Sequence, residues 1–236
     1  MIVKYVISEE IFKNNPGYIR GIIYLRDANN YGTDEELNDA LKAQEDRARS
    51  IFTIERLREE SYIASWREAF QKFGSNPNKY PPSIENLIKR ILKGHTLPYI
   101  NKLVTIFNYI SLKYVLPCGG DDLDRVEGDL LLTYAKGDEL YIPLNESEPQ
   151  PVVTGEVIYK DDRKVLCRKW TWRQGDATKI LPESKDVIIN VDGMPPAGED
   201  DVKAAMSEMA ALIKKYCGGD IVMDIISERK NTYELL

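Results

Sequence analysis

The chain has 236 residues, and its 32 Lys and Arg against 38 Asp and Glu give a formal net charge of −6 at pH 7. This balance argues against a protein that coats nucleic acid through bulk positive charge, although it does not exclude a local basic face. Its three cysteines are widely spaced and odd in number, and no leader pattern follows Met1, so we expect a reducing, cytoplasmic setting.

The first part of the chain predicts two strands followed by three helices. Thr33 is a candidate N-cap, because three acids follow it in the first turn of the helix that it would begin. Gly74 and Gly94 are expected to end the next two helices, since glycine favours the position just beyond a helix. The expected segments are strands at 2–7 and 18–25 and helices at 33–60, 63–73 and 83–92.

A buried helix followed by a glycine-rich corner is the most informative stretch of the sequence. From Leu97, apolar residues recur at helical spacing over roughly five turns. The run Pro-Cys-Gly-Gly-Asp-Asp at 117–122 cannot continue that helix. We therefore expect a polar corner at 117–122 whose backbone amides can approach a ligand closely.

After Gly128 the hydrophobic spacing shortens to that of strands. The expected segments are hairpins that pair 129–135 with 140–143 and 156–159 with 164–167, a strand at 187–191, a helix at 199–216 and a strand at 220–226. A helical first half that leads into a mostly stranded second half is typical of the α+β class.

Two groups of residues carry a family resemblance. The first comprises Trp66-Arg67-Glu68-Ala69-Phe70, Lys79-Tyr80-Pro81-Pro82-Ser83, Leu97-Pro98, Asn101, Asn108, Leu116-Pro117, Gly119-Gly120 and Asp122-Leu123-Asp124. The second comprises Cys167-Arg168-Lys169-Trp170, Trp172-Arg173-Gln174, Asp176 and Thr178-Lys179. With these motifs, the chain resembles the free-standing B3/B4-domain proteins over about residues 1–226. Those proteins are similar to the editing domain of the phenylalanyl-tRNA synthetase beta subunit.

The resemblance implies one domain over 1–236, with 1–95 as an integral extension, 96–226 as the core and 227–236 as a tail. It implies a sheet-rich, sandwich-like core carrying helices, and a pocket that in the synthetase hydrolyses the ester of a mischarged tRNA end. The partners to expect are tRNA or its aminoacylated 3′ end and an amino acid. Neither DNA nor a membrane is expected, and neither is a cofactor or metal. Ligase activity is not carried over, because the sequence has no ATP-binding motif.

The sequence departs from the synthetase pattern at two places. Where the synthetase reads Pro-Met-His-Ala-Phe-Asp, this chain has Pro-Cys-Gly-Gly-Asp-Asp at 117–122, so glycine stands at the histidine position. The second pocket segment falls near 173–176 and lacks the glutamate that reads a tyrosine hydroxyl. The recognised amino acid is therefore left open.

An aminoacyl ester is already activated, so a positioned water and a donor for the developing oxyanion can suffice for hydrolysis. Asp176 and Thr178 are the candidate catalytic residues, with Asp121 as a second carboxylate able to orient water or hold an ammonium group. The glycines at 119 and 120 are candidate N–H donors. The candidate substrate-binding residues are Asn108, Lys113, Gly119, Gly120, Asp121, Arg168, Trp170, Trp172, Arg173 and Gln174.

Each feature also has a purely structural interpretation. The two tryptophans suit stacking on an adenine or burial in the core, and the two arginines suit terminal phosphates or surface ion pairs. Cys118 is expected to be a buried, inert thiol. The segment 67–113 holds eight Lys and Arg against two Glu, which indicates either an RNA-facing surface or helix faces paired with acids elsewhere.

Three functions fit these observations. The first is a hydrolase that deacylates mischarged tRNA in trans. The second is a non-catalytic RNA or tRNA-end binding module, consistent with the missing histidine and glutamate. The third is a pocket for a free amino acid.

Overall fold

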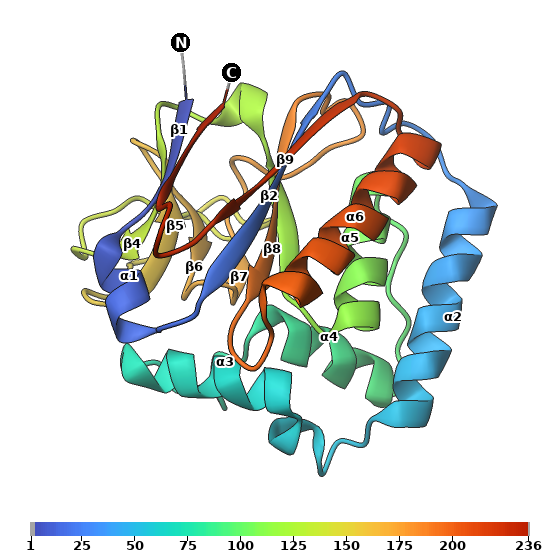
Figure 1. Cartoon of the computed structure of the whole chain (residues 1–236), viewed down its shortest axis with the longest axis horizontal. Helices are drawn as coiled ribbons and strands as arrows, with labels where there is room; N and C mark the ends of the chain where they lie inside the picture. Colours follow the sequence, from blue (N-terminus) through green and yellow to red (C-terminus); the bar gives the residue numbers. More distant parts are fainter. Residues whose placement is uncertain (1–2, 236) are drawn as a thin grey trace.

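The computed structural model describes residues 3–235, which form two β-sheets with the longer helices gathered at one side and below (Figure 1). The six-stranded sheet has the spatial order β10 (Thr232–Leu235), β1 (Val3–Ile7), β4 (Leu130–Tyr134), β5 (Val157–Lys160), β6 (Val165–Arg168) and β7 (Arg173–Gln174). The four-stranded sheet has the order β3 (Cys118–Asp122), β8 (Val187–Gly193), β2 (Ile19–Arg26) and β9 (Asp220–Ile226). The expected α+β class is confirmed.

The α-helices are α1 (Glu9–Asn14), α2 (Glu35–Ile51), α3 (Ser61–Lys72), α4 (Ser83–Leu92), α5 (Lys102–Tyr114) and α6 (Glu199–Tyr216). Short 3-10 helices occupy Leu57–Glu59 and Leu123–Arg125. Helices α5 and α6 pack on the four-stranded sheet, and α2 packs outside α5 (Figure 1). None of the helices within residues 3–235 combines the length and hydropathy that a membrane crossing requires.

Several helix boundaries differ from expectation, and a capping side chain sets two of the helix starts. The cap of α2 is Asp34, not Thr33, since the Asp34 side chain accepts the Leu37 N–H at 2.9 Å. Helix α2 also ends at Ile51 rather than near residue 60. The helix expected from Leu97 begins only at Lys102, because Asn101 caps it by accepting the Val104 N–H.

Three further expectations for the secondary structure need correction. The hairpin expected between 129–135 and 140–143 is wrong, because β4 lies between β1 and β5 and Leu140 makes only an isolated bridge to Lys164. The segment 227–236, expected as a tail, contains β10, which pairs antiparallel with β1. Helix α1 lies between the first two expected strands and was missed. The hairpin of β5 and β6 is confirmed.

The two faces of the four-stranded sheet differ because side chains alternate along each strand. Gly21 and Ile23 of β2 face α6, whereas Arg20 and Ile22 face the six-stranded sheet. A Cβ atom built on Gly21 would lie 2.2 Å from the Met206 Sδ and 2.8 Å from a Val202 methyl. Glycine at this position therefore allows α6 to approach the sheet closely.

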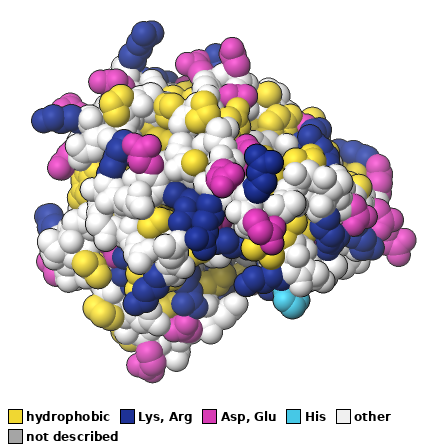
Figure 2. Space-filling model, turned by 90° about the horizontal axis from the view of Figure 1, so that it is seen from below, with side chains coloured by type: hydrophobic (Ala, Val, Ile, Leu, Met, Phe, Trp, Pro, Cys, Tyr) yellow, Lys and Arg dark blue, Asp and Glu magenta, His cyan; other side chains and the backbone are white. Residues whose placement is uncertain are grey.

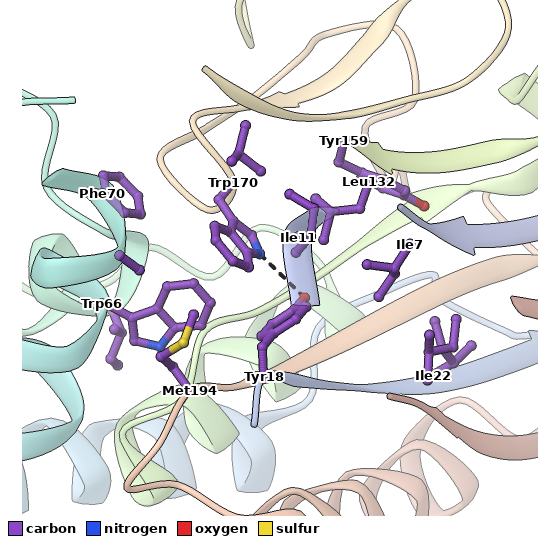
Figure 3. Packing of buried hydrophobic residues seen from close by; sticks show 14 of the residues in the cluster. Ile7, Ile11, Tyr18, Ile22, Trp66, Phe70, Leu132, Tyr159, Trp170 and Met194 are labelled. Atoms are coloured by element: carbon purple, nitrogen blue, oxygen red, sulfur yellow. Dashed lines mark hydrogen bonds between the residues drawn. The ribbon is translucent and has the colours of Figure 1, made fainter. Parts of the chain in front are cut away.

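The apolar core between the sheets and α3 is built on aromatic rings (Figure 3). The Trp170 ring meets the Trp66 ring edge to face, with 5.2 Å between centroids, and the Tyr18 ring at 4.8 Å in the same manner. Trp66, Trp170 and Tyr18 are each at most 1% exposed. Such edge-to-face pairs add to the free energy of area burial. This cluster ties α3 to both sheets.

We predict that Gly21→Ala destabilises the fold by about 1–3 kcal/mol, because the added methyl overpacks the contact with Val202 and Met206. Gly119→Ala is the matched control, since a Cβ on that strand glycine meets nothing within 4 Å. The control should leave the free energy of unfolding unchanged or slightly higher. Urea unfolding of both variants measures the difference, and equal stabilities would contradict the close-packing role of Gly21.

Candidate functional site

A cavity of about 150 Å³ lies between the two sheets, and we call it the chamber. It brings together the two motif segments that are distant in sequence, one from β3 and one from the turn between β6 and β7. Its lining residues are Arg20, Ser83, Pro117, Cys118, Gly119, Gly120, Asp121, Tyr159, Leu166, Cys167, Trp170, Thr171, Trp172, Gln174, Asn190 and Asp192.

The glycine-rich corner expected at 117–122 is in fact the edge strand β3, which pairs antiparallel with β8. The two glycines have opposite environments. A Cβ on Gly119 would meet open space, whereas a Cβ on Gly120 would lie 3.2 Å from Phe107 and Ile180 and 2.9 Å from the Ile188 carbonyl oxygen. Gly119 therefore leaves room beside the strand, and Gly120 allows the strand to pack on α5.

The open edge of β3 presents backbone groups to the site. The Gly120 carbonyl accepts the Gln174 Nε2–H at 2.9 Å, and the Asp122 N–H donates to the Thr178 carbonyl at 2.9 Å. Because backbone groups alternate in direction along an antiparallel strand, the Gly120 N–H also points to this open edge. The Gly119 N–H points instead toward β8. Of the two expected N–H donors, Gly120 has the suitable direction.

A buried ion pair forms part of the chamber wall. The Arg20 Nε and Nη2 donate to the two oxygens of Asp192 at 2.6 and 2.9 Å. Asp192 also accepts the Tyr18 O–H at 2.6 Å, and Tyr18 in turn accepts the Trp170 Nε1–H at 3.3 Å (Figure 3). The geometry is bidentate and both charges are satisfied, as burial requires.

The other side of Arg20 extends this network to β1. Its Nη1 donates to the Tyr5 hydroxyl, which donates to Asn190 Oδ1 at 2.9 Å. Sequence analysis missed Arg20 and Asp192 as site residues. The signal was present, because an arginine inside the apolar run at 18–25 must be paired once it is buried.

Asp121 is a carboxyl group of the chamber whose pKa is displaced toward neutral pH. Burial raises the pKa of its carboxyl to about 7, although hydrogen bonds from Thr178 and Gln174 oppose the shift. The Thr178 Oγ1 donates to Oδ1 at 2.6 Å and the Gln174 Nε2 at 3.3 Å. Asp121 can therefore exchange a proton near neutral pH.

Asp176, the other candidate acid, lies outside the chamber lining. Hydrogen bonds from Lys179, at 2.8 Å, and from the Asn145 N–H, at 2.7 Å, lower the pKa of its carboxyl. Thr178 is fully buried and reaches the chamber only through Asp121. The structure thus separates the two candidate catalytic residues.

The expected substrate cations are engaged by acids. The buried Arg168 donates to Glu156 at 2.6 and 2.8 Å. Arg173 bonds Glu146 at 2.7 Å. Arg168 therefore forms a buried ion pair with Glu156 outside the chamber lining. Arg173 lies nearer the surface, where Glu146 neutralises its charge.

Lys113 also lies away from the chamber, because its ammonium group bonds both oxygens of Glu208 at 2.6 and 2.7 Å. Arg67 and Lys89 bond the buried Glu85 in the same way. Figure 2 looks onto the molecule from below and shows Lys and Arg side chains near its centre with acidic side chains beside them. Glu85 is already counted among the acids of segment 67–113, so its pairs do not reduce the charge excess of the segment. The Lys113–Glu208 pair offsets one positive charge of that excess.

The two tryptophans do not alternate along a strand, because Lys169 and Trp170 both have positive φ, 46° and 65°. This turn directs Trp170 into the aromatic core, while both Trp170 and Trp172 line the chamber. The Trp172 ring contacts the Tyr80 ring edge to face, with centroids 4.7 Å apart. Cys118 is half-buried, not fully buried as expected, and desolvation raises the pKa of its thiol to about 12.

A second cavity, of about 330 Å³, lies against the chamber, and we call it the outer pocket. It shares Cys118, Gly119, Gly120 and Gln174 with the chamber lining, so the two cavities meet at β3. Its other lining residues are Ile100, Val104, Phe107, Asn108, Leu144, Asn145, Lys179, Ile180 and Leu181. Asn108, a candidate binding residue, belongs to this pocket. Within residues 3–235 no group of three His, Cys, Asp or Glu gathers as metal ligands.

Comparison with known proteins agrees with the motifs. Residues 65–218 match the B3/4 domain family. The beta subunit of phenylalanine–tRNA ligase from Fusobacterium nucleatum is 23% identical over 164 residues, which are 60% of this chain and 20% of that protein. The chain thus spans about a fifth of the length of this relative.

A solved N-terminal fragment of the phenylalanyl-tRNA synthetase beta subunit from Pyrococcus horikoshii is similar with a TM-score of 0.47 and 14% identity. That comparison covers 91% of this chain and 49% of the fragment. The family match covers more than half of the chain and contains β3 and the turn between β6 and β7. This chain therefore belongs to the B3/4 domain family.

Proposed function

We propose that this chain hydrolyses the ester bond between an amino acid and the 3′ end of a mischarged tRNA presented in trans. The observation that carries the proposal is the meeting of the chamber and the outer pocket at the open edge of β3. The aminoacylated end of a tRNA consists of an amino acid and a larger terminal nucleoside joined by one ester bond. Two adjoining cavities of different size suit these two parts. Membership of the B3/4 family and similarity to a tRNA ligase subunit support the same substrate class.

In this proposal the amino-acid side chain enters the chamber and the terminal nucleoside occupies the outer pocket. A cavity of about 150 Å³ can hold a group the size of a benzene ring, which suits a side chain but not a nucleoside. The larger outer pocket offers apolar walls, the amides of Asn108 and Asn145, and Lys179. The scissile carbonyl then lies at the β3 edge.

The chemistry requires one water. Asp121 as a carboxylate accepts a proton while the water oxygen attacks the ester carbonyl, and the Gly120 N–H stabilises the oxyanion. The carbon–oxygen bond to the ribose then breaks, and the ribose oxygen takes up the proton. The products are a free amino acid and a tRNA with a free 3′ terminus. Thr178 and Gln174 position Asp121 through their bonds to Oδ1.

A panel of mischarged tRNAs should release amino acid in the presence of the purified protein. Asp121→Asn should lower kcat at least 100-fold, because the amide cannot accept the proton. Asp176→Ala should instead raise KM with a smaller effect on kcat, since it frees Lys179 and the Asn145 loop at the outer pocket.

Salt-sensitive tRNA binding without release of amino acid would indicate a binding module. Binding of free amino acid alone would indicate the third function.

Filling the chamber tests its use without disturbing the core. Gly119→Val should fold normally, because the position faces open space, and should abolish hydrolysis by occupying the volume meant for the side chain. Gly119→Ala should retain most activity. For both variants, kcat/KM measures the activity and circular dichroism shows whether the protein is folded. Full activity of a folded Gly119→Val protein would exclude the chamber as the acyl site.

The pH profile should follow the pKa of Asp121. If its carboxylate is the base, kcat/KM rises with pH and levels off above about 7. The pKa of Asp121 in the folded protein lies above the ordinary value of 3.8, so the protonated carboxyl stabilises the fold at low pH. This contribution to the free energy of unfolding is lost as the pH rises through about 7. Relative to Asp121→Asn, the wild type should lose about 4 kcal/mol of unfolding free energy between pH 4 and pH 8. Parallel pH profiles for the two proteins would contradict this assignment.

A further inference from the structure

The strands at the edges of the two sheets differ in how well their edges are protected. Strand β7 has only two residues, and β3 is covered in part by the Gln174 side chain and the Thr178 carbonyl. Strand β10 has four residues and exposes no large apolar side chain within residues 3–235. Strand β9 has seven residues and exposes Val222 and Met223, each at 45%. A long edge with apolar side chains on both faces is a template for pairing with another chain.

The register of the four-stranded sheet shows which backbone groups of β9 point outward. Along an antiparallel strand, the N–H and C=O groups of successive residues point to alternate sides. The Asp192 N–H of β8 donates to the Pro117 carbonyl, on the β3 side, at 3.0 Å. Through the pairings of β8 with β2 and of β2 with β9, this bond places the backbone groups of Ile221, Met223 and Ile225 at the outer edge.

One of these three outer positions is already occupied. The Ile225 N–H donates to Asp224 Oδ1 at 2.7 Å, and the Lys230 ammonium group bonds the other oxygen of that carboxylate. Within residues 3–235, no hydrogen bond engages the outward N–H of Ile221 or Met223. Strand β9 therefore offers another chain two adjacent outward positions.

A groove of about 460 Å³ lies between β9 and α6, and we call it the edge groove. Figure 1 shows β9 in front of β2 with α6 beside it. The apolar walls of the groove are Met206 of α6 and Met223 and Ile225 of β9. Its polar lining residues are Glu199, Lys203, Ser207, Asp224, Ser227 and Lys230. Apolar surface thus continues from the edge strand into the groove, where the side chains of an added strand can pack.

The charges around the edge groove are balanced. Lys203 bonds Glu199 at 2.6 Å, and Lys230 bonds Asp224. These charges sum to zero, although the whole chain carries −6. A two-fold axis brings a surface against itself, so a surface of one sign would repel its copy, whereas a surface of both signs can exchange ion pairs with it. The balance favours a second copy of this chain as the occupant.

We infer that two copies of this chain pair antiparallel through β9 and join their four-stranded sheets into one continuous sheet. The pairing that uses only the open N–H groups places Ile221 of each copy opposite the partner's Met223. Each such pair exchanges both N–H···O bonds. Val222 then lies opposite its own copy at the axis, so the pairing covers both of the exposed apolar side chains of β9.

The dimer is weak and leaves the site open. One strand pair with its flanking side chains is a small interface, so we expect dissociation in the micromolar range. Asp220 lies opposite the partner's Asp224, whose charge the partner's Lys230 neutralises. Strands β9 and β3 form opposite edges of the four-stranded sheet, so each chamber lies at an outer end of the joined sheet. The inference is therefore independent of the proposed function.

Sedimentation velocity of the full chain, from micromolar to near-millimolar concentration, should show a reversible equilibrium between monomer and dimer. Met223→Lys should raise Kd at least tenfold, because a lysine on an edge strand opposes pairing with an apolar row. Val153→Lys is the matched control, since Val153 is 58% exposed and lies outside the strands. A monomer at every concentration, or the same loss of dimer in both variants, would overturn the inference.

Met223→Pro tests the backbone pairing. Proline removes the outward N–H at this position but none of the bonds from β9 to β2, so Tm should change little while the dimer is lost. Met223→Ala keeps the N–H and should retain more dimer than the proline variant. A folded Met223→Pro protein that dimerises as the wild type does would exclude pairing through β9.

Val222→Cys tests the register. Opposing Cβ atoms of a non-hydrogen-bonded antiparallel pair lie about 4.5–5.5 Å apart, within reach of a disulfide after a small adjustment. Mild oxidation should therefore link two copies of the Val222→Cys protein, whereas the wild type and Val153→Cys should remain unlinked. Absence of the link at a concentration where the protein is dimeric would overturn the pairing about Val222.

Discussion

The bidentate ion pair between Arg20 and Asp192 is the interaction on which the site depends. It joins β2 to β8 on the face that looks toward the other sheet, and its two ends connect to Tyr18 and Tyr5. Removing either charge would leave the other buried and unpaired, which is among the most destabilising changes that a core can suffer. The pair therefore sets a polar boundary at which the apolar packing stops and the chamber begins.

Strand β3 then divides the space next to this boundary. Its two adjacent glycines serve different purposes, since Gly119 leaves volume open and Gly120 permits contact with Phe107 of α5. A side chain at the first position would occupy the chamber, and one at the second would push the strand away from the helix. One short edge strand thus has a packed face, an open face and an open row of backbone groups.

Much of the fold was predictable because hydrophobic periodicity is local. Helix α6 and strand β9 agree with their expected ranges, and the β5–β6 hairpin was found from its turn. The first expected hairpin failed because β4 pairs with β1 across more than a hundred residues, a contact that no local pattern reports. The two sequence motifs correctly indicated the segment of β3 and the turn at 169–172 between β6 and β7. They could not show that Arg168 is bonded to Glu156, because the identity of a buried charge partner is a tertiary property.

The antiparallel pairing of β1 with β10 has a consequence for the exposed edges of the six-stranded sheet. Val3 lies opposite Leu235, so β10 covers one edge of β1 while β4 covers the other. A strand edge with unpaired backbone donors and acceptors can pair with another chain. Detachment of β10 would therefore make β1 the edge of the sheet and open a route to self-association.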